Sequence, residues 1–208
     1  KSYPFEYTAC LDLVDKDKFI KYWQDAHLHF DRIKKVVTKD FSDYGISIET
    51  ASLEPAFLCD LYGIQGRLDI LELNPKTKSK IVELKSGGVP FPDDGTSIKP
   101  NHKAQLYLYY QLVGVLNKLG FAEISEKTDG YILYSKVSEN NLRYDKPTLK
   151  RVQSILELRN RIIINEFQLA SDDINICQSL IQKITPDAII NSANVHPKFK
   201  AILEPQIS

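Results

Sequence analysis

The stretch from residue 66 to residue 87, GRLDILELNPKTKSKIVELKSG, constrains the fold more than any other part of the chain. It reads as two apolar strands joined by a polar turn that holds Lys76, Lys78 and Lys80, which predicts a β-hairpin. Charged residues interrupt both strands, since Asp69 falls within the first strand and Glu83 and Lys85 fall within the second. Buried strands rarely carry charges unless these are paired or bind a metal, so the pattern points to chemistry at the hairpin.

The geometry of a strand brings these charges together. Residues two apart share one face of a strand, so Glu83 and Lys85 point the same way. Val82 and Leu84 point the other way, into packing, and Asp69 lies on the neighbouring strand across the hairpin. Two carboxylates in contact repel each other, and a bound divalent cation removes the repulsion. Mg²⁺ prefers oxygen ligands and is commonly held by one or two carboxylates.

The three charged residues of the hairpin therefore predict a metal-dependent phosphodiesterase site. In such a site the lysine orients the attacking water or stabilises negative charge on the phosphate. The alternative is an exposed edge strand, on which a glutamate and a lysine only prevent aggregation. A glycine- and proline-rich loop, residues 87–100, follows the second strand directly, and long loops inside a domain are often functional.

The rest of the sequence predicts helices and strands around the hairpin. Apolar side chains at helical spacing predict helices at residues 16–39, 101–119, 147–169 and 172–184. Asp15 or Asp17 is placed to cap the first helix, and Gly120 ends the second. Extended segments are predicted at residues 45–59 and 129–137. This order predicts an α/β fold, with a central mixed sheet flanked by helices.

Composition limits the classes of protein open to the chain. Its 208 residues suit one domain, and an apolar content of 43% indicates a globular protein. Because the formal net charge is zero, any contact with nucleic acid must be local rather than a matter of bulk charge. No stretch is long and apolar enough to span a membrane and no signal peptide is visible, so we expect a cytoplasmic protein without membrane contact.

The cysteines indicate the redox compartment of the protein, and the absence of methionine bears on whether the chain is a fragment. Cys10, Cys59 and Cys177 are far apart and odd in number, which indicates neither a zinc site nor a disulfide framework and favours a reducing compartment. The chain begins with Lys1 and contains no methionine. We therefore expect a fragment of a longer protein, or methionines replaced by a non-standard residue.

Motifs in a fixed order resemble the RecB-type branch of the PD-(D/E)xK nuclease superfamily. That branch has G-x-x-D, then E-x-K, then a helix bearing Q-x-x-x-Y. This chain has G-x-x-D ending at Asp69, E-x-K from Glu83 to Lys85, and Q-x-x-x-Y from Gln105 to Tyr109. Within the branch it is most similar to the nuclease domain of the replication helicase-nuclease that trims Okazaki flaps and to CRISPR-associated exonucleases. Ordered motifs are far more specific than any one alone.

The resemblance implies a restriction-endonuclease-like core and a role for each motif. Asp69, Glu83 and the backbone carbonyl of Leu84 would hold Mg²⁺ or Mn²⁺, and Lys85 would assist the attacking water. Members of this branch also carry a metal-binding histidine on the early helix. His27 fits the family spacing and His29 is the alternative. The other interpretation of either histidine is an exposed helical residue without a ligand role.

Further residues match the branch around these motifs. Gln105 and Tyr109 share one face of their helix. The resemblance implies that they would brace the lysine and contact the DNA backbone. The alternative for both is simple packing in an amphipathic helix. His102 matches a His-x-x-Gln pattern of the branch, and Glu54 falls where flap-nuclease relatives carry an acid. The cysteine trio that binds an iron–sulfur cluster in many relatives has no counterpart after Tyr110, so no cluster is predicted.

The resemblance implies a metal-dependent deoxyribonuclease, a single nuclease domain over residues 1–208, that acts on single-stranded or flapped DNA in replication or repair. A helicase or ATPase motor would lie elsewhere in the parent chain, since this chain has no Walker A run. Lys99 and Lys103, beside the loop and the second helix, are candidates for binding the DNA strand. The alternatives are a nuclease-derived module that binds DNA or protein without cutting, and a dimeric site-specific endonuclease.

Overall fold

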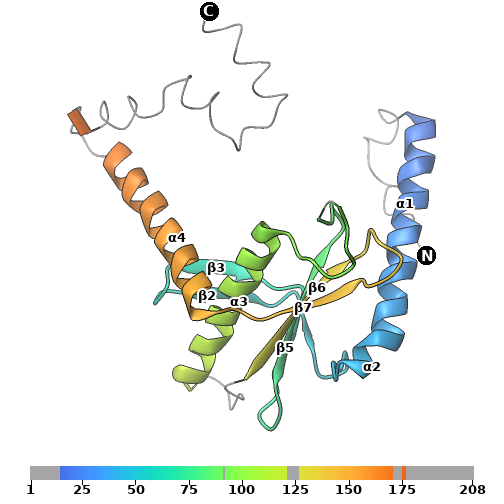
Figure 1. Ribbon diagram of the computed structural model, residues 1–208, viewed down its shortest axis with the longest axis horizontal. Helices are drawn as coiled ribbons and strands as arrows, with labels where there is room; N and C mark the ends of the chain where they lie inside the picture. Colours follow the sequence, from blue (N-terminus) through green and yellow to red (C-terminus); the bar gives the residue numbers. More distant parts are fainter. Residues whose placement is uncertain (1–14, 91, 121–126, 171–174, 177–208) are drawn as a thin grey trace, which may run out of the picture. The chain divides into compact units, whose positions relative to one another are not determined.

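The computed structural model describes residues 15–90, 92–120, 127–170 and 175–176. The chain forms two compact units, Lys1–Thr148 and Leu149–Ser208, while the expectation of one nuclease domain over the whole chain stays a prediction. The first unit is mixed α/β and is built around a five-stranded mixed sheet with helices on both faces (Figure 1). The predicted α/β class, with a central mixed sheet flanked by helices, is therefore confirmed.

The segments at residues 79–85 and 128–134 are inner strands of the central sheet, and nearly all of their residues are buried, as expected for strands that are covered on both faces. In sheet order the five strands are β1 (Ser52–Leu53), β4 (Ile70–Glu72), β5 (Ser79–Lys85), β6 (Thr128–Tyr134) and β7 (Leu142–Asp145). β5 and β6 run parallel, and all other neighbours run antiparallel. The predicted hairpin is present as β4 and β5, and the strand predicted from residue 129 is present as β6. The sequence did not predict β7.

The first strand of the predicted hairpin is divided between two sheets. Its beginning belongs to β3 (Ile64–Arg67), which pairs with β2 (Ala56–Cys59) in a separate two-stranded sheet. Its end belongs to β4. Asp69 lies between β3 and β4, where the chain passes from one sheet to the other, and not within a strand as predicted.

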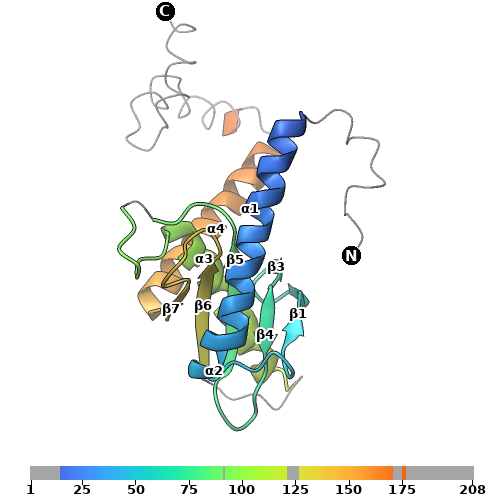
Figure 2. The same ribbon diagram turned by 90° about the vertical axis from the view of Figure 1, so that its right-hand side faces the viewer.

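A long helix covers one face of the central sheet (Figure 2). α1 (Lys16–Lys35) begins after Asp15, whose side chain caps it as predicted, and runs through a π-helical turn, η2 (Val36–Asp40), into α2 (Phe41–Asp43). Apolar side chains of these helices and of the sheet form a buried core. Its members are Val36, Phe41, Ile46, Val82, Tyr131, Leu133 and Leu142, with Leu84 packed against them.

The opposite face of the sheet is covered by α3 (Pro100–Lys118), which connects the parallel strands β5 and β6. A helical crossover of this kind is what parallel neighbours require. The helix predicted at residues 101–119 is thereby confirmed, and Gly120 has a φ of +67°, the left-handed conformation in which glycine ends helices. Val82 and Leu84 face the α1 side, as the period of two predicts, so Glu83 and Lys85 face α3.

The second unit contains α4 (Leu149–Leu169), which begins two residues later than the predicted helix at 147–169. Asn175 and Ile176 are helical, and the remainder of the helix predicted at 172–184 lies outside the described residues. Among the residues that the structure describes, no helix is long and apolar enough to cross a membrane.

Candidate active site

The two carboxylates of the hairpin motif face each other across β4 and β5. The register pairs Ile70 with Val82, and one further step along both chains sets Asp69 opposite Glu83. A hydrogen bond from the backbone N–H of Leu84 to Asp69 Oδ2, 2.7 Å long, fixes the Asp69 side chain at β5. Although Asp69 lies outside a regular strand, the structure thus brings it to Glu83, as the sequence predicts.

Glu83 is buried, with 4% of its surface exposed. Its Oε1 accepts hydrogen bonds from Lys85 Nζ at 2.8 Å and from Gln105 Nε2 at 2.7 Å. Its Oε2 is buried without a hydrogen-bond partner among the described residues. Burial raises the pKa of the Glu83 carboxyl above its ordinary value, the hydrogen bond from Lys85 opposes this shift, and the negative charge of Asp69 adds to it. A buried carboxylate with a free oxygen beside a second carboxylate is costly for a fold to hold.

A chain of hydrogen bonds from α3 fixes the lysine. Lys85 Nζ donates to Gln105 Oε1 at 2.7 Å, Gln105 Nε2 donates to the Tyr109 hydroxyl at 2.8 Å, and Tyr109 donates to the carbonyl of Arg67 at 2.9 Å. Burial raises the pKa of Tyr109, so its phenol stays protonated and remains a donor. The helix residues four apart therefore brace Lys85 in the way that the resemblance implied.

Close packing of Tyr109 accounts for the glycine of the first motif. A Cβ on Gly66 would lie 3.0 Å from Cε1 of the Tyr109 ring, which is tighter than ordinary van der Waals contact. Because Tyr109 is buried and its hydroxyl already has two partners, it occupies a bracing position. Its contact with DNA stays a prediction.

The donor set at this centre fits Mg²⁺ or Mn²⁺. Hard oxygen ligands are present in Asp69 and Glu83, and Glu83 Oε2 is a buried acceptor that no described donor satisfies. Within the described part of the chain, no group of three or more histidines, cysteines and acids is placed to hold a metal. The candidate centre therefore offers two carboxylates, and water would complete the coordination. The roles of the Leu84 carbonyl and of an early histidine as ligands stay predictions.

The structure distinguishes the two early histidines. His27 Nδ1 lies 2.9 Å from the carbonyl oxygen of Trp23 in its own helix, and its ring packs edge-on against the Trp23 ring. His29 Nδ1 lies 2.8 Å from Ser135 Oγ, and the backbone N–H of Ser135 donates to the carbonyl of Lys85. His29, rather than the favoured His27, is therefore the histidine that reaches the end of the strand bearing the motif.

Glu54 and His102 lie near the centre through different contacts. The N–H of Glu54 donates to the carbonyl of Asp69 at 2.9 Å, while its exposed carboxylate pairs with Arg67 at 3.3 Å. His102 Nδ1 lies 2.8 Å from the Tyr134 hydroxyl, and Tyr134 is the cross-strand neighbour of Lys85. His102 therefore lies near Lys85, whereas the carboxylate of Glu54 is paired with Arg67.

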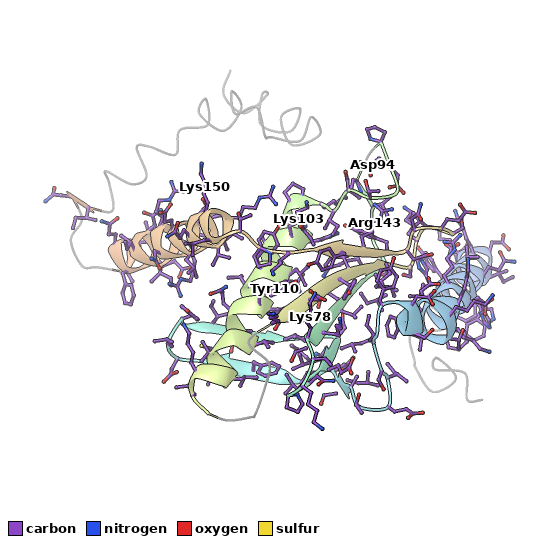
Figure 3. All side chains as sticks on the ribbon, turned by 60° about the horizontal axis from the view of Figure 1, so that its bottom comes forward. Lys78, Asp94, Lys103, Tyr110, Arg143 and Lys150 are labelled. Carbon is purple, nitrogen blue, oxygen red and sulfur yellow. The ribbon has the colours of Figure 1, made fainter. Side chains whose placement is uncertain are left out.

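The candidate DNA-binding lysines differ in their surroundings. Lys103 lies on α3 (Figure 3). Its Nζ pairs with Asp145 at 3.0 Å, whereas no described residue forms an ion pair with Lys99. Lys80, which the sequence places in the hairpin turn, lies within β5 and is buried against Asp129. Its position in the turn was therefore predicted wrongly, because the strand begins one residue earlier, at Ser79.

Two residues near the centre were not identified from the sequence, namely Tyr134 and Arg143. Tyr134 is fully buried in β6, and its place in an apolar strand hides its polar contacts. Arg143 is buried in β7, a strand too short to give a clear pattern. Only the fold shows that Tyr134 is the cross-strand neighbour of Lys85 and that Arg143 stacks over the Tyr134 ring.

Comparison of the chain with models of known protein families found no match. Comparison with curated proteins found no match either. The resemblance to RecB-type nucleases therefore rests on the ordered motifs alone.

Proposed function

We propose that this chain is a metal-dependent nuclease domain of the RecB type, with a restriction-endonuclease-like core, that hydrolyses phosphodiester bonds in single-stranded or flapped DNA. One observation carries the proposal. Glu83 is buried beside Asp69 with an oxygen that has no partner among the described residues, while Lys85 is fixed against its other oxygen. Such an arrangement costs stability in the absence of a cation, which favours a role in binding one.

Asp69 and Glu83 would hold the metal ion. When bound, Mg²⁺ or Mn²⁺ supplies a Lewis acid that polarises a phosphate oxygen and lowers the pKa of a water molecule. Hydrogen bonds within the protein hold the remaining polar groups of the centre. Which atom donates and which accepts in each bond determines how these groups are oriented.

The orientation of the Gln105 amide is determined by Tyr109. The phenol has one hydrogen, which it donates to the carbonyl of Arg67, so it must accept from Gln105 Nε2. Gln105 therefore turns its Oε1 toward Lys85. Two of the three ammonium hydrogens of Lys85 are used by Gln105 and Glu83. The third is available to orient an attacking water or to donate to a phosphate oxygen.

The wider setting is proposed on the motif resemblance. We place the domain in a helicase-nuclease of DNA replication or repair, with the motor elsewhere in the parent chain. Relatives that trim flaps support single-stranded or flapped DNA as the substrate class.

Cleavage of labelled single-stranded DNA in Mn²⁺ or Mg²⁺ tests the proposal. Asp69→Ala and Lys85→Ala should each lower the cleavage rate roughly 10²–10³-fold, as loss of one group that stabilises the transition state does. Lys118→Ala, which removes a charge at the far end of α3, is the matched control and should cleave at the wild-type rate. Equal activity in all four proteins would end the assignment. DNA binding without cleavage by the wild type would favour the non-cutting module.

A further inference from the structure

Tyr134 links the glycine- and proline-rich loop to the candidate active site. It is paired with Lys85 across β5 and β6, so the two side chains are neighbours on the α3 face of the sheet. Its hydroxyl accepts the backbone N–H of Lys99 at 3.2 Å and lies 2.8 Å from His102 Nδ1. The end of the loop and the first turn of α3 are therefore fixed beside the lysine of the centre.

One tautomer of His102 uses the hydrogen of the Tyr134 hydroxyl. The Tyr134 hydroxyl accepts from Lys99, so its single hydrogen is available to His102 Nδ1. Burial lowers the pKa of His102, and the positive charges of Lys85 and Lys99 lower it further. A neutral ring that accepts at Nδ1 carries its hydrogen on Nε2. In that tautomer His102 presents an N–H donor at Nε2 while its Nδ1 accepts from Tyr134.

Lys99 supplies a positive charge close to this donor. Its Nζ lies 2.9 Å from the position that a Cβ on Gly88 would occupy, so the ammonium lies against the loop just after β5. Within the described residues no carboxylate pairs with it. By contrast, Lys103 on the next turn is paired with Asp145. Of these two lysines, Lys99 is therefore the one without an ion pair among the described residues.

Arg143 holds the loop that carries Lys99 (Figure 3). Its guanidinium, whose side chain is 2% exposed, pairs with Asp93 at 2.9 Å and donates to the carbonyl of Ser97 at 2.6 Å. It also stacks over the Tyr134 ring, 4.9 Å from the centroid. The buried Arg143 thus binds the loop at two points, and its guanidinium lies against Tyr134, the residue that contacts Lys99 and His102. A glycine-rich loop fixed in this way is preorganised rather than adaptable.

We propose that Lys99 and His102 form a subsite that binds a phosphate of the DNA strand next to the phosphate cleaved at Lys85, with Tyr134 and Arg143 as positioning residues. An ammonium and a neutral N–H donor suit the charge and the lone pairs of a phosphate. Because the contacts are to phosphate, the subsite sets the register of the strand and reads no sequence. The inference rests on the proposed nuclease function.

The salt dependence of DNA binding tests the subsite directly. Affinity of the full chain for fluorescently labelled oligothymidylate is measured by anisotropy in EDTA, over a range of salt concentrations. For a single strand, the slope of log K against log salt concentration decreases by about 0.7 for each phosphate that the protein no longer neutralises. Lys99→Gln should show this decrease, together with several-fold weaker binding. Lys118→Gln has the same loss of charge at the other end of α3 and should keep the wild-type slope.

Tyr134→Phe separates positioning from charge. The substitution removes only the hydroxyl, so affinity should fall while the salt slope remains that of the wild type. In cleavage assays Lys99→Gln should raise KM with little change in kcat, because it removes binding that is equal in the ground state and the transition state. Thermal unfolding of each variant shows that the fold is intact.

The outcomes separate this inference from the proposed function. If Lys99→Gln matches Lys118→Gln in slope and affinity while Asp69→Ala abolishes cleavage, the subsite is refuted and the nuclease stands. If Lys99→Gln loses slope while Asp69→Ala cleaves normally, the subsite stands and the catalytic centre is refuted. Wild-type protein that does not bind the oligonucleotide at all would overturn the subsite.

Discussion

Replacing Lys85 with methionine removes the cation that accompanies a buried carboxylate. The ammonium lies 2.8 Å from Glu83 Oε1, and the exposed fractions of the two side chains are 18% and 5%. Removing one partner of a buried ion pair costs about 3–5 kcal/mol of unfolding free energy. Gln105 still donates to Glu83 in the variant and Lys85 is partly exposed, so we expect the lower end, about 3 kcal/mol. In a protein of this size the unfolding midpoint would fall by roughly 6–12 °C.

The cost of this substitution depends on pH in a defined direction. The pKa of Glu83 is already raised, and loss of Lys85 raises it further because the hydrogen bond and the charge that lower it are gone. The destabilisation is complete above that raised pKa, where Glu83 is ionised. The destabilisation decreases as the pH falls through this raised pKa, because a protonated carboxyl needs no cation. The loss should therefore be larger in mildly alkaline buffer than in mildly acidic buffer.

Thermal or urea unfolding in EDTA measures the effect, with Lys85→Met, Glu83→Gln and the double variant compared with the wild type. The double variant should recover most of the loss, because no unpaired charge is left in the core. Adding Mg²⁺ at about 100 times its dissociation constant should stabilise Lys85→Met by about 2.7 kcal/mol and leave the double variant nearly unchanged. If the double variant is as unstable as Lys85→Met, the unpaired Glu83 charge is not the cause, and the electrostatic reasoning is refuted.

Two further predictions concern the same centre. In metal-free buffer the wild type should lose stability as the pH rises from the ordinary pKa of a glutamate toward the raised pKa of Glu83, because the folded state binds the proton of this carboxyl more tightly than the unfolded state does. Urea unfolding midpoints measure this dependence on pH, and Glu83→Gln should lack it. Gly66→Ala should push the Tyr109 ring by a few tenths of an ångström, slow cleavage several-fold and lower stability by about 1 kcal/mol. Gly114→Ala is the control, because nothing lies within 4 Å of a Cβ at that position. An unchanged cleavage rate in Gly66→Ala would show that the contact with Tyr109 does not matter.

Local sequence patterns determined several elements of this protein and the two faces of β5. The alternation from Val82 to Lys85 predicted which side chains enter the core and which face α3, because a strand has a period of two. Asp15 and Gly120 marked helix ends because capping depends on a few neighbouring residues. The spacing of Gln105 and Tyr109 predicted that their side chains lie on the same helix face, where they contact each other, since residues four apart share a face.

Tertiary structure alone decided which distant segments meet. His29 and Ser135 lie 106 positions apart in sequence, and no local pattern distinguishes His29 from His27 as the residue that reaches the sheet. The short strand that carries Arg143 is stable only because β6 pairs with it, so its sequence signal is weak. Local periodicity fixes the direction of a side chain relative to its own element, whereas its partner depends on how the elements pack, and that is why Tyr134 and Arg143 emerged only from the fold.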